Sequence, residues 1–377
     1  MLVLESLKHL VNWVSSPDRF FVLTAVAYFA VLFPGELGPA WLRRLTRPLQ
    51  AVYRPRVFWS LFALVGLLFA LSCLDPNFAL IVGKPDNVPI AGMIFLVAFF
   101  VWFALQQARE NDRRVAAGQP LIEKQEKGDP KVMVWPDLVY TEFICLILFT
   151  VFLILWSILL KAPIEEPANP AKTPNPSKAP WYFLGLQEML VYFDPWIAGV
   201  LLPGLIIVGL MAIPYIDTNP RGNGYYTFRE RRWEITIFLF GFVGLWVWLI
   251  VIGTFLRGPN QNFFGPFEYW DAHKLVPLIN VQLSQMIWVK LLGVGLPKNP
   301  LVREAFGLLL VAAYFLVLPP LMAKRWLNGF YGKMGPARFY TMAVLLLTML
   351  ALPIKMMLRW TLNMQFLVNI PEVFFNI

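Results

Sequence analysis

The sequence predicts an all-α fold: a polytopic membrane helix bundle of about eight transmembrane helices, with interfacial helices beside them. Three observations predict it. Of the 377 residues, 58% are hydrophobic and only 15% charged, whereas soluble domains carry roughly 25% charged residues. Long stretches of the chain contain no charge at all. The basic residues, finally, collect in alternate loops between these stretches.

The charge-free stretches define the membrane spans. They are Phe20–Gly35, Val57–Leu74, Pro89–Gln106, Phe143–Leu160, Pro195–Pro214, Ile235–Leu256, Ala305–Ala323 and Phe339–Ile354. A span needs about 20 apolar residues, and most of these stretches reach or nearly reach that length. We expect apolar flanks to complete the two shortest, namely Trp41 and Leu42 after the first and Met356–Leu358 after the last. Because unpaired backbone groups are costly in lipid, the stretches must be helical.

The N-terminal segment Met1–Ser16 precedes the first span. It lacks the pattern of a signal peptide. Leucines and valines recur in it near helical spacing, with polar residues between them, which is typical of an amphipathic helix on the membrane surface. The alternative is a soluble arm that packs against a partner.

The distribution of basic residues predicts the topology. Most of the 32 lysines and arginines lie in the loops after the first, third, fifth and seventh helices, in Arg43–Arg56, Arg109–Lys131, Arg221–Arg232 and Lys324–Arg338. The positive-inside rule places these loops in the cytoplasm and both termini outside. The net charge of +9 is therefore a topology signal, and we expect no nucleic-acid partner.

The metal-ligating residues are few. The chain has two cysteines, Cys73 and Cys145, both within predicted spans, which we interpret as small buried apolar residues. Its two histidines, His9 and His273, lie outside the spans. Neither a c-type heme motif, nor an iron–sulfur cysteine cluster, nor a pair of membrane histidines for a b heme is present. We expect no metal site, so any redox cofactor must lie on a partner or enter as a quinone.

Between the fourth and fifth spans lies a distinctive exterior segment. Six prolines within Pro163–Pro180 predict a stiff, extended crossing that cannot be helical. A short aromatic stretch, Trp181–Leu190, follows directly. Considered alone, it is typical of an anchor at the membrane interface, where tryptophan and tyrosine are enriched.

The order of features around this crossing resembles a known family. Pro136-Asp137-Leu138-Val139-Tyr140 opens the fourth span, Glu166-Pro167 begins the crossing, Trp181-Tyr182-Phe183 follows it, Ile213-Pro214-Tyr215 ends the fifth span, and Arg231-Arg232 precedes the sixth. This succession is similar to subunit IV of cytochrome bf-type complexes, the C-terminal half of cytochrome b. The resemblance covers Lys124–Arg257. We therefore divide the chain into three segments: 1–123 with three spans, 124–257 of cytochrome b type, and 258–377 with an exterior aromatic loop and two spans.

The resemblance implies an exterior quinol site formed by Pro180, Trp181, Tyr182 and Phe183. The family's loop carries Pro-Glu-Trp-Tyr, whose glutamate takes a proton from quinol; here the corresponding residues are Ala-Pro-Trp-Tyr, so Pro180 replaces the acid. Our candidate proton acceptor is Glu188, two turns beyond Trp181, with Asp194 second. The alternative for Glu188 is a solvated carboxylate at the interface.

At the cytoplasmic side, Asp137, Tyr140 and Glu142 begin the fourth span. In the family this region borders the quinone-reduction site, which makes the three residues candidates for a negative-side quinone site. Capping of the helix start by Asp137 is the competing explanation.

The resemblance implies a heme-free membrane subunit of a bc-type quinol:cytochrome c oxidoreductase in an energy-transducing membrane. Its expected partners are lipids, a cytochrome b subunit that carries the b hemes, a Rieske-type iron–sulfur protein and a c-type cytochrome; the quinol is menaquinol or ubiquinol. The aromatic exterior segment Arg257–Val302 predicts a docking surface for a peripheral redox subunit, with a second interfacial helix over Ile279–Leu292. A purely structural anchor that has lost quinol chemistry is the alternative. A transporter is disfavoured, because the spans lack paired charges.

Overall fold

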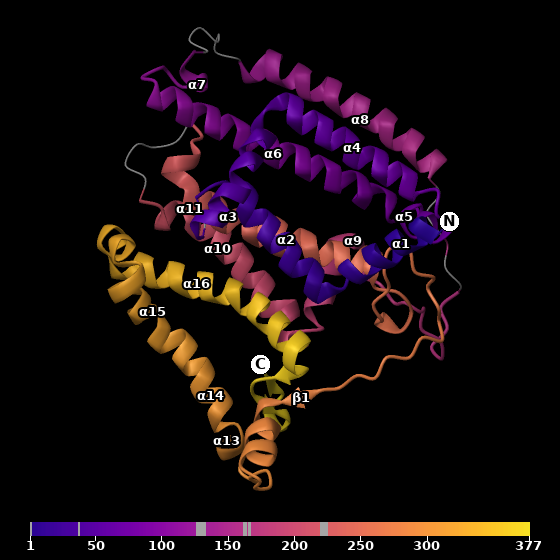
Figure 1. The fold of residues 1–377 in the computed structure, drawn as a ribbon, viewed down its shortest axis with the longest axis vertical. Helices are drawn as coiled ribbons and strands as arrows, with labels where there is room; N and C mark the ends of the chain where they lie inside the picture. The colour runs from indigo at the N-terminus through magenta and orange to yellow at the C-terminus, as the bar shows by residue number, and fades with distance from the viewer. Residues whose placement is uncertain (1, 37, 126–132, 161–163, 165–166, 219–224) are drawn as a thin grey trace.

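The computed structural model describes residues 2–36, 38–125, 133–160, 164, 167–218 and 225–377, which form a bundle of long helices (Figure 1). Within these ranges, 7 helices are long and apolar enough to cross a membrane. They are Pro55–Ser72, Val88–Ala116, Val134–Leu159, Ile197–Ile216, Phe228–Leu256, Ala305–Trp326 and Asn328–Leu362. Each overlaps one of the predicted spans, so seven of the eight spans and the all-α class are confirmed.

The first predicted span is the exception. It is helix α2, Pro17–Leu32, whose 16 residues fall just short of the roughly 17–25 that a span needs. The helix ends at Phe33, directly before Pro34, because a proline disfavours helical backbone at the residue that precedes it. The expectation that Trp41 and Leu42 extend this span is wrong, since these residues belong to a separate helix, α3 (Ala40–Thr46).

Several of the long helices contain wider π-helical turns beside the α-helical ones; the label η marks π-helical segments and also the short 3-10 helices η1, η6 and η10. In chain order the long helices comprise α4 (Pro55–Ser72), α6 (Val88–Ala116), η2 (Val134–Leu138) with α8 (Val139–Leu159), η3 (Ile197–Leu201) with α10 (Leu202–Ile216), α11 (Phe228–Leu239) with η4 (Phe240–Val247), α12 (Trp248–Val251) and η5 (Ile252–Leu256), α14 (Ala305–Ala312) with η8 (Ala313–Val317), α15 (Leu318–Leu321) and η9 (Met322–Trp326), and α16 (Asn328–Leu362).

Short elements connect the long helices. The helical ones are α1 (Leu2–Val14), η1 (Arg47–Tyr53), α5 (Pro76–Val82), α7 (Ile122–Gln125), α9 (Trp181–Met189), η6 (Pro259–Gln261), η7 (Gln285–Leu291), α13 (Pro300–Arg303) and η10 (Pro371–Val373). The strands are β1 (Val281–Gln282), β2 (Met364–Phe366), β3 (Asn369–Ile370) and β4 (Phe375–Asn376). Strand β1 pairs with β2 in parallel, and β3 pairs with β4 antiparallel.

The predicted interfacial helix over Ile279–Leu292 forms only in its second half. Its first residues make β1, which pairs with β2 at the C-terminus, and only η7 is helical. The chain returns toward β1 after α16 because Asn363 takes a left-handed conformation, with φ of 53°, that ends the helix. Asparagine tolerates this conformation better than most residues.

One apolar core joins the three segments defined from the sequence. It includes Phe21 of α2, Tyr192 after α9, Leu249 of α12 and Met356 of α16, all buried. A second core joins α2, α6 and α11, with Phe33, Leu105 and Phe228 among its members. The segments therefore pack together, and the division of the chain at residues 124 and 257 stays a prediction.

Helix α1 lies across the end of the bundle that also carries α5 and α9, here called the α9 end (Figure 1). Lys8 of α1 forms an ion pair with Asp75, which caps α5, at 2.7 Å. Leu4, Leu7 and Leu10 of α1 are more than half exposed. The predicted amphipathic helix is present, and its exposed leucines form an apolar strip suited to a membrane surface.

Several residues of the predicted motifs lie outside the described ranges. They are Glu126, Lys127, Asp129, Lys131 and Arg221 of the basic loops, and Lys161, Pro163 and Glu166 at the start of the crossing.

Candidate functional site

The proline-rich crossing, described from residue 167, forms neither helix nor strand up to Pro180, with a turn between Asn169 and Lys172, and α9 begins after it. Side-chain amides fasten it to its surroundings. The Gln187 side chain of α9 donates to the Ser177 carbonyl and accepts from the Ala179 backbone N–H, both at 2.8 Å. Gln261 also donates to the Ser177 carbonyl, at 2.8 Å. These bonds hold the last residues of the crossing between α9 and the turn that follows η5.

Helix α9 lies against the last turns of the helix Phe228–Leu256. Its inward face buries Leu184, Gly185, Glu188 and Met189. The close approach of α9 to the helix Phe228–Leu256 depends on Gly253, because a Cβ at this position would lie only 3.3 Å from the Leu184 carbonyl oxygen. The packing fixes α9 as a short rigid helix at the α9 end of the bundle.

The outward side of α9 presents a row of aromatic rings. Trp181, Tyr182 and Phe183 are 40%, 50% and 51% exposed. The Trp181 and Tyr182 ring centroids are 5.6 Å apart, and those of Tyr182 and Phe183 are 4.7 Å apart. Pro180 directly precedes this row as the residue at the helix start. The four residues predicted as a quinol site therefore form one contiguous surface.

Glu188 faces the other way. Its side chain is 3% exposed and accepts two hydrogen bonds from Arg257, from Nη2 at 2.7 Å and from Nε at 3.0 Å. The alternative of a solvated carboxylate is therefore wrong. Burial lowers the pKa of Arg257, but the charge and hydrogen bonds of Glu188 outweigh burial and raise that pKa above its ordinary value. The result is a buried, two-point ion pair behind the aromatic row.

Lys178 is a residue that the sequence argument missed. Its Nζ donates to the Thr254 carbonyl at 2.8 Å and lies 4.7 Å from the centre of the Trp270 ring. Among the described residues, no carboxylate lies within ion-pair distance of it. Burial, together with the charges of Lys84 and Arg257 and against that of Glu188, lowers its pKa to about 7. The sequence signal that could have identified it is a lysine inside the crossing, directly before Ala179-Pro180.

Asp194, the second acid considered, is tied to the C-terminus. Its Oδ2 accepts a hydrogen bond from the Asn376 side chain at 2.9 Å. The carboxylate thus fastens the chain end beside the start of η3.

Asp137, Tyr140 and Glu142 lie at the other end of the bundle. The helix from Val134 to Leu159 lies between them and the crossing, and its far end is about 26–33 Å from these three residues at 1.5 Å per residue. Their side chains are mostly exposed, apart from a stacked contact between Trp135 and Tyr140 at 5.9 Å. No side chain of the described residues makes a capping hydrogen bond at this helix start, so the capping explanation for Asp137 is wrong. The three residues stay candidates for a second site.

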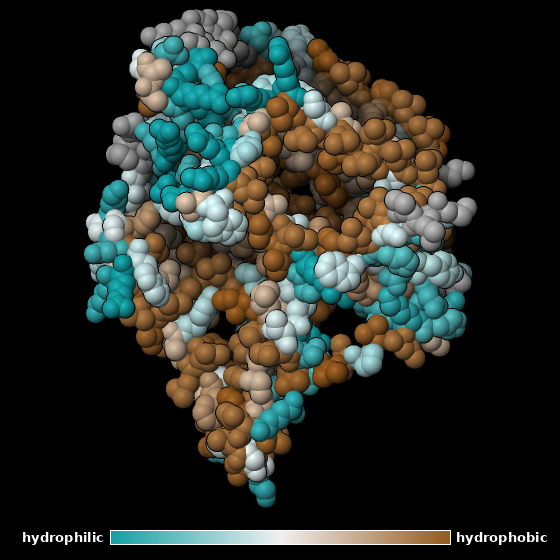
Figure 2. Space-filling view, viewed as in Figure 1, coloured by the Kyte–Doolittle hydropathy of each residue, from teal (hydrophilic) through white to brown (hydrophobic). Residues whose placement is uncertain are grey.

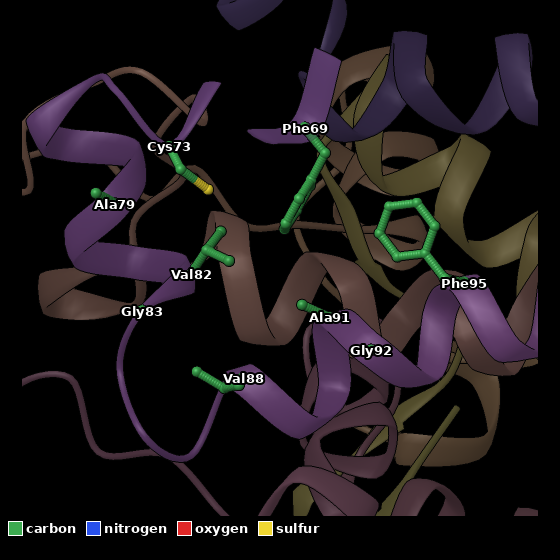
Figure 3. Close-up of a pocket in the computed structure, with 9 residues that line it drawn as sticks. All are labelled: Phe69, Cys73, Ala79, Val82, Gly83, Val88, Ala91, Gly92 and Phe95. Atoms are coloured by element: carbon green, nitrogen blue, oxygen red, sulfur yellow. The ribbon is translucent and has the colours of Figure 1, made fainter. Parts of the chain in front are cut away.

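Two adjoining apolar cavities lie among the N-terminal helices. One, of about 400 Å³, lies between the end of α4, α5 and the start of α6 (Figure 3). The other, of about 540 Å³, reaches from these helices to Phe255 and Pro266. Cys73 lines the smaller cavity, and both Cys73 and Cys145 are exposed thiols, so the interpretation of two buried cysteines is wrong. In the described part of the chain no cluster of three potential metal ligands occurs.

Residues 167–265 match the family model described as cytochrome b (C-terminal)/b6/petD. The match confirms the predicted resemblance over the crossing, α9, η3 with α10, the helix Phe228–Leu256 and the turn that holds Gln261. It covers just over a quarter of the 377 residues and begins after α8, so the resemblance of residues 124–166 stays a prediction. No solved structure matches the chain.

Proposed function

We propose that this chain, whose residues 167–265 are of cytochrome b C-terminal type, is a heme-free membrane subunit of a bc-type quinol:cytochrome c oxidoreductase. It would form the positive-side quinol-oxidation pocket together with a separate cytochrome b subunit that carries the b hemes. A Rieske-type iron–sulfur protein would take the first electron, the b hemes the second, and a c-type cytochrome would follow. The exposed row Trp181–Phe183 on a fixed helix carries the proposal.

The aromatic row supplies one wall of the proposed pocket. Its rings are large, rigid and apolar, and they sit at the end of the crossing where Gln187 and Gln261 restrain the backbone. A quinol ring can stack or wedge against such a wall with little loss of side-chain freedom on binding. Helix α8 is consistent with a missing second wall, because none of its residues is buried within the described chain.

Proton acceptance is the part of the proposal that needs a new residue. Both carboxylate oxygens of Glu188 already accept hydrogen bonds from Arg257, so a quinol can reach this carboxylate only after Arg257 moves away. The Lys178 amine meets no such competitor. With a pKa of about 7 it is largely neutral above that pH and can accept a proton that the quinol releases. We therefore propose Lys178, in addition to Glu188, as a candidate proton acceptor.

The alternative function is a structural anchor that has lost quinol chemistry. Two observations favour it. Pro180 stands where the family has its glutamate, and the Glu188 carboxylate is already paired with Arg257. An anchor requires neither the exposed aromatic row nor an available amine. The two functions therefore predict different effects of removing the Trp181 side chain on quinol oxidation.

The test is quinol:cytochrome c reductase activity of the complex purified in mild detergent, with heme spectra as the measure of assembly. We expect Trp181→Ala to lower kcat/KM at least tenfold with unchanged b-heme content. The control is Trp41→Ala, which removes an exposed tryptophan on α3. Equal activity of all three forms would leave the structural anchor, and absence of any b heme from the purified complex would refute membership of a bc-type complex.

A further inference from the structure

The larger apolar cavity, here called the aromatic cavity, lies away from the proposed quinol site. Its walls come from α4, α5, α6 and the last turns of the helix Phe228–Leu256. Figure 2 shows the brown, apolar surface over the N-terminal helices hollowed in this region. At about 540 Å³, it falls within the usual range of ligand-binding cavities, roughly 300–1,000 Å³.

The lining excludes a polar ligand. Of the residues around the aromatic cavity, only Ser15 has a polar side chain; the rest are aliphatic, aromatic or proline. Water needs about 2–4 polar partners to occupy a cavity, so an apolar space of this kind favours hydrocarbon. An acyl chain that enters it from the bilayer exchanges lipid contacts for protein contacts, so the stabilisation comes from filling a void whose lining would otherwise lack packing partners.

The lining extends far enough along α4 to take a hydrocarbon chain. Along α4 the lining runs from Phe58 to Phe69, about 16 Å at 1.5 Å per residue. This is about half of the roughly 30 Å hydrocarbon thickness of a bilayer, the depth of a single leaflet. The length therefore suits one hydrocarbon tail that lies parallel to the helices.

The cavity has a roof and an open side. The junction of α1 and α2 at Ser15, together with Pro266, covers it at the α9 end. This roof is held by the Lys8–Asp75 ion pair and by the hydrogen bond from the Phe267 N–H to Asn12 Oδ1, at 2.9 Å. Leu61 and Val65 line the cavity and are also 43% and 53% exposed, so the cavity opens sideways toward lipid.

The quinone is not the molecule best placed to fill the cavity. Gly185 of α9 meets Trp246 and Ile250, whereas Val251 and Phe255 line the cavity. Successive residues of a helix point about 100° apart, so these pairs belong to different faces. The helix Phe228–Leu256 therefore lies between the cavity and α9.

We propose that the aromatic cavity holds one acyl chain of a membrane phospholipid, inserted from the leaflet at the α9 end. The adjoining smaller cavity shares Phe69, Val82, Ala91 and Phe95 with it and extends to Gly83 and Val88, where the chain passes from α5 to α6 (Figure 3). It provides apolar space for the part of the lipid close to the headgroup. This lipid site is independent of quinol chemistry.

The test counts phospholipid and quinone per chain in the purified complex, by native mass spectrometry and by extraction after extensive detergent washing. Ala98→Phe fills the cavity from α6, because Ala98 lines it, and Ala98→Leu fills it in part. The control is Leu96→Phe, which places the same ring at an exposed position of α6 that lines neither cavity. We expect wild type and Leu96→Phe to retain one phospholipid, with occupancy at least tenfold lower in Ala98→Phe and intermediate in Ala98→Leu.

Two results would overturn the proposal: equal phospholipid retention in all four forms, or a retained molecule that is quinone and disappears in Ala98→Phe. The subunit masses in the same spectra identify a variant that has not assembled, in which case Ala98→Leu decides. Because the readout is a bound mass, it is separate from the reductase assay. A complex without quinol activity that still holds the phospholipid would refute the proposed function and leave the lipid site standing.

Discussion

Removing Arg257 tests the most consequential contact in the structure. Arg257→Met leaves the Glu188 carboxylate, 3% exposed, without its two hydrogen bonds from the guanidinium. Loss of one partner from a buried ion pair costs about 3–5 kcal/mol, because an uncompensated charge stays behind. Loss of the further bond from Arg257 to the Gln261 carbonyl adds about 1 kcal/mol.

The assay is thermal unfolding of the purified complex in detergent, followed by tryptophan fluorescence. A loss of this size lowers Tm by an amount on the order of 5–10 °C. The double variant Glu188→Leu/Arg257→Met removes both charges, so we expect it to recover most of that loss, since apolar replacements of buried pairs are often close to neutral. Its reductase activity then separates a catalytic Glu188 from a structural one.

The control is an exposed ion pair. Arg113 lies 3.1 Å from Glu110, and their side chains are 67% and 32% exposed. Pairs of this kind contribute about 0–1 kcal/mol, so Arg113→Met should leave Tm nearly unchanged. If Arg257→Met also leaves Tm unchanged, the buried pair does not stabilise the fold. If the double variant is as unstable as the single one, the unpaired charge of Glu188 is not the cause of the loss.

Three further variants have defined outcomes. Folding lowers the pKa of Lys178 from 10.5 to about 7, so between these pH values the unfolded chain binds more protons than the folded one. Wild type should therefore gain stability relative to Lys178→Met as the pH rises from about 7 to 10.5. Parallel curves of Tm against pH for the two proteins would contradict this. Gly307→Ala would drive its Cβ into the Leu367 carbonyl oxygen, so we expect a clear drop in Tm, whereas Gly329→Ala, with open space, should match wild type. Asn111→Ala removes a fully buried side chain that bonds the Ile122 N–H and the Tyr226 carbonyl, so tryptic cleavage of the α6–α8 loop should accelerate; unchanged cleavage would mean these bonds do not hold the loop.

The spans and the crossing could be predicted from the sequence because they depend on local composition. A charge-free stretch such as Val57–Leu74 has no low-energy state in lipid other than a helix, and the observed α4 differs from it by only two residues at each end. The described part of the proline-rich crossing is not helical for a similarly local reason: proline removes the backbone donor that a helix needs. The first span is shorter than predicted because Pro34, itself a local signal, ends the helix at the residue before it.

The interior of the candidate site could not be predicted in the same way. Glu188 and Arg257 are 69 positions apart, and Lys178 meets a carbonyl 76 positions away. Such contacts depend on how α9 packs against the helix Phe228–Leu256, which hydrophobic periodicity does not specify. One signal was available: Arg257 is a basic residue at the predicted exterior end of a span, against the positive-inside pattern, and such a residue calls for an acidic partner.

The exposure of α8 bears on how the protein is made. No residue between Val134 and Leu159 is buried, so the packing that the described chain provides does little to retain this helix. If a partner subunit covers α8, a newly inserted copy would leave this helix exposed until that subunit reached it. The lifetime of the free chain, and with it the balance of synthesis between the two subunits, would then depend on how quickly that encounter occurs in the membrane.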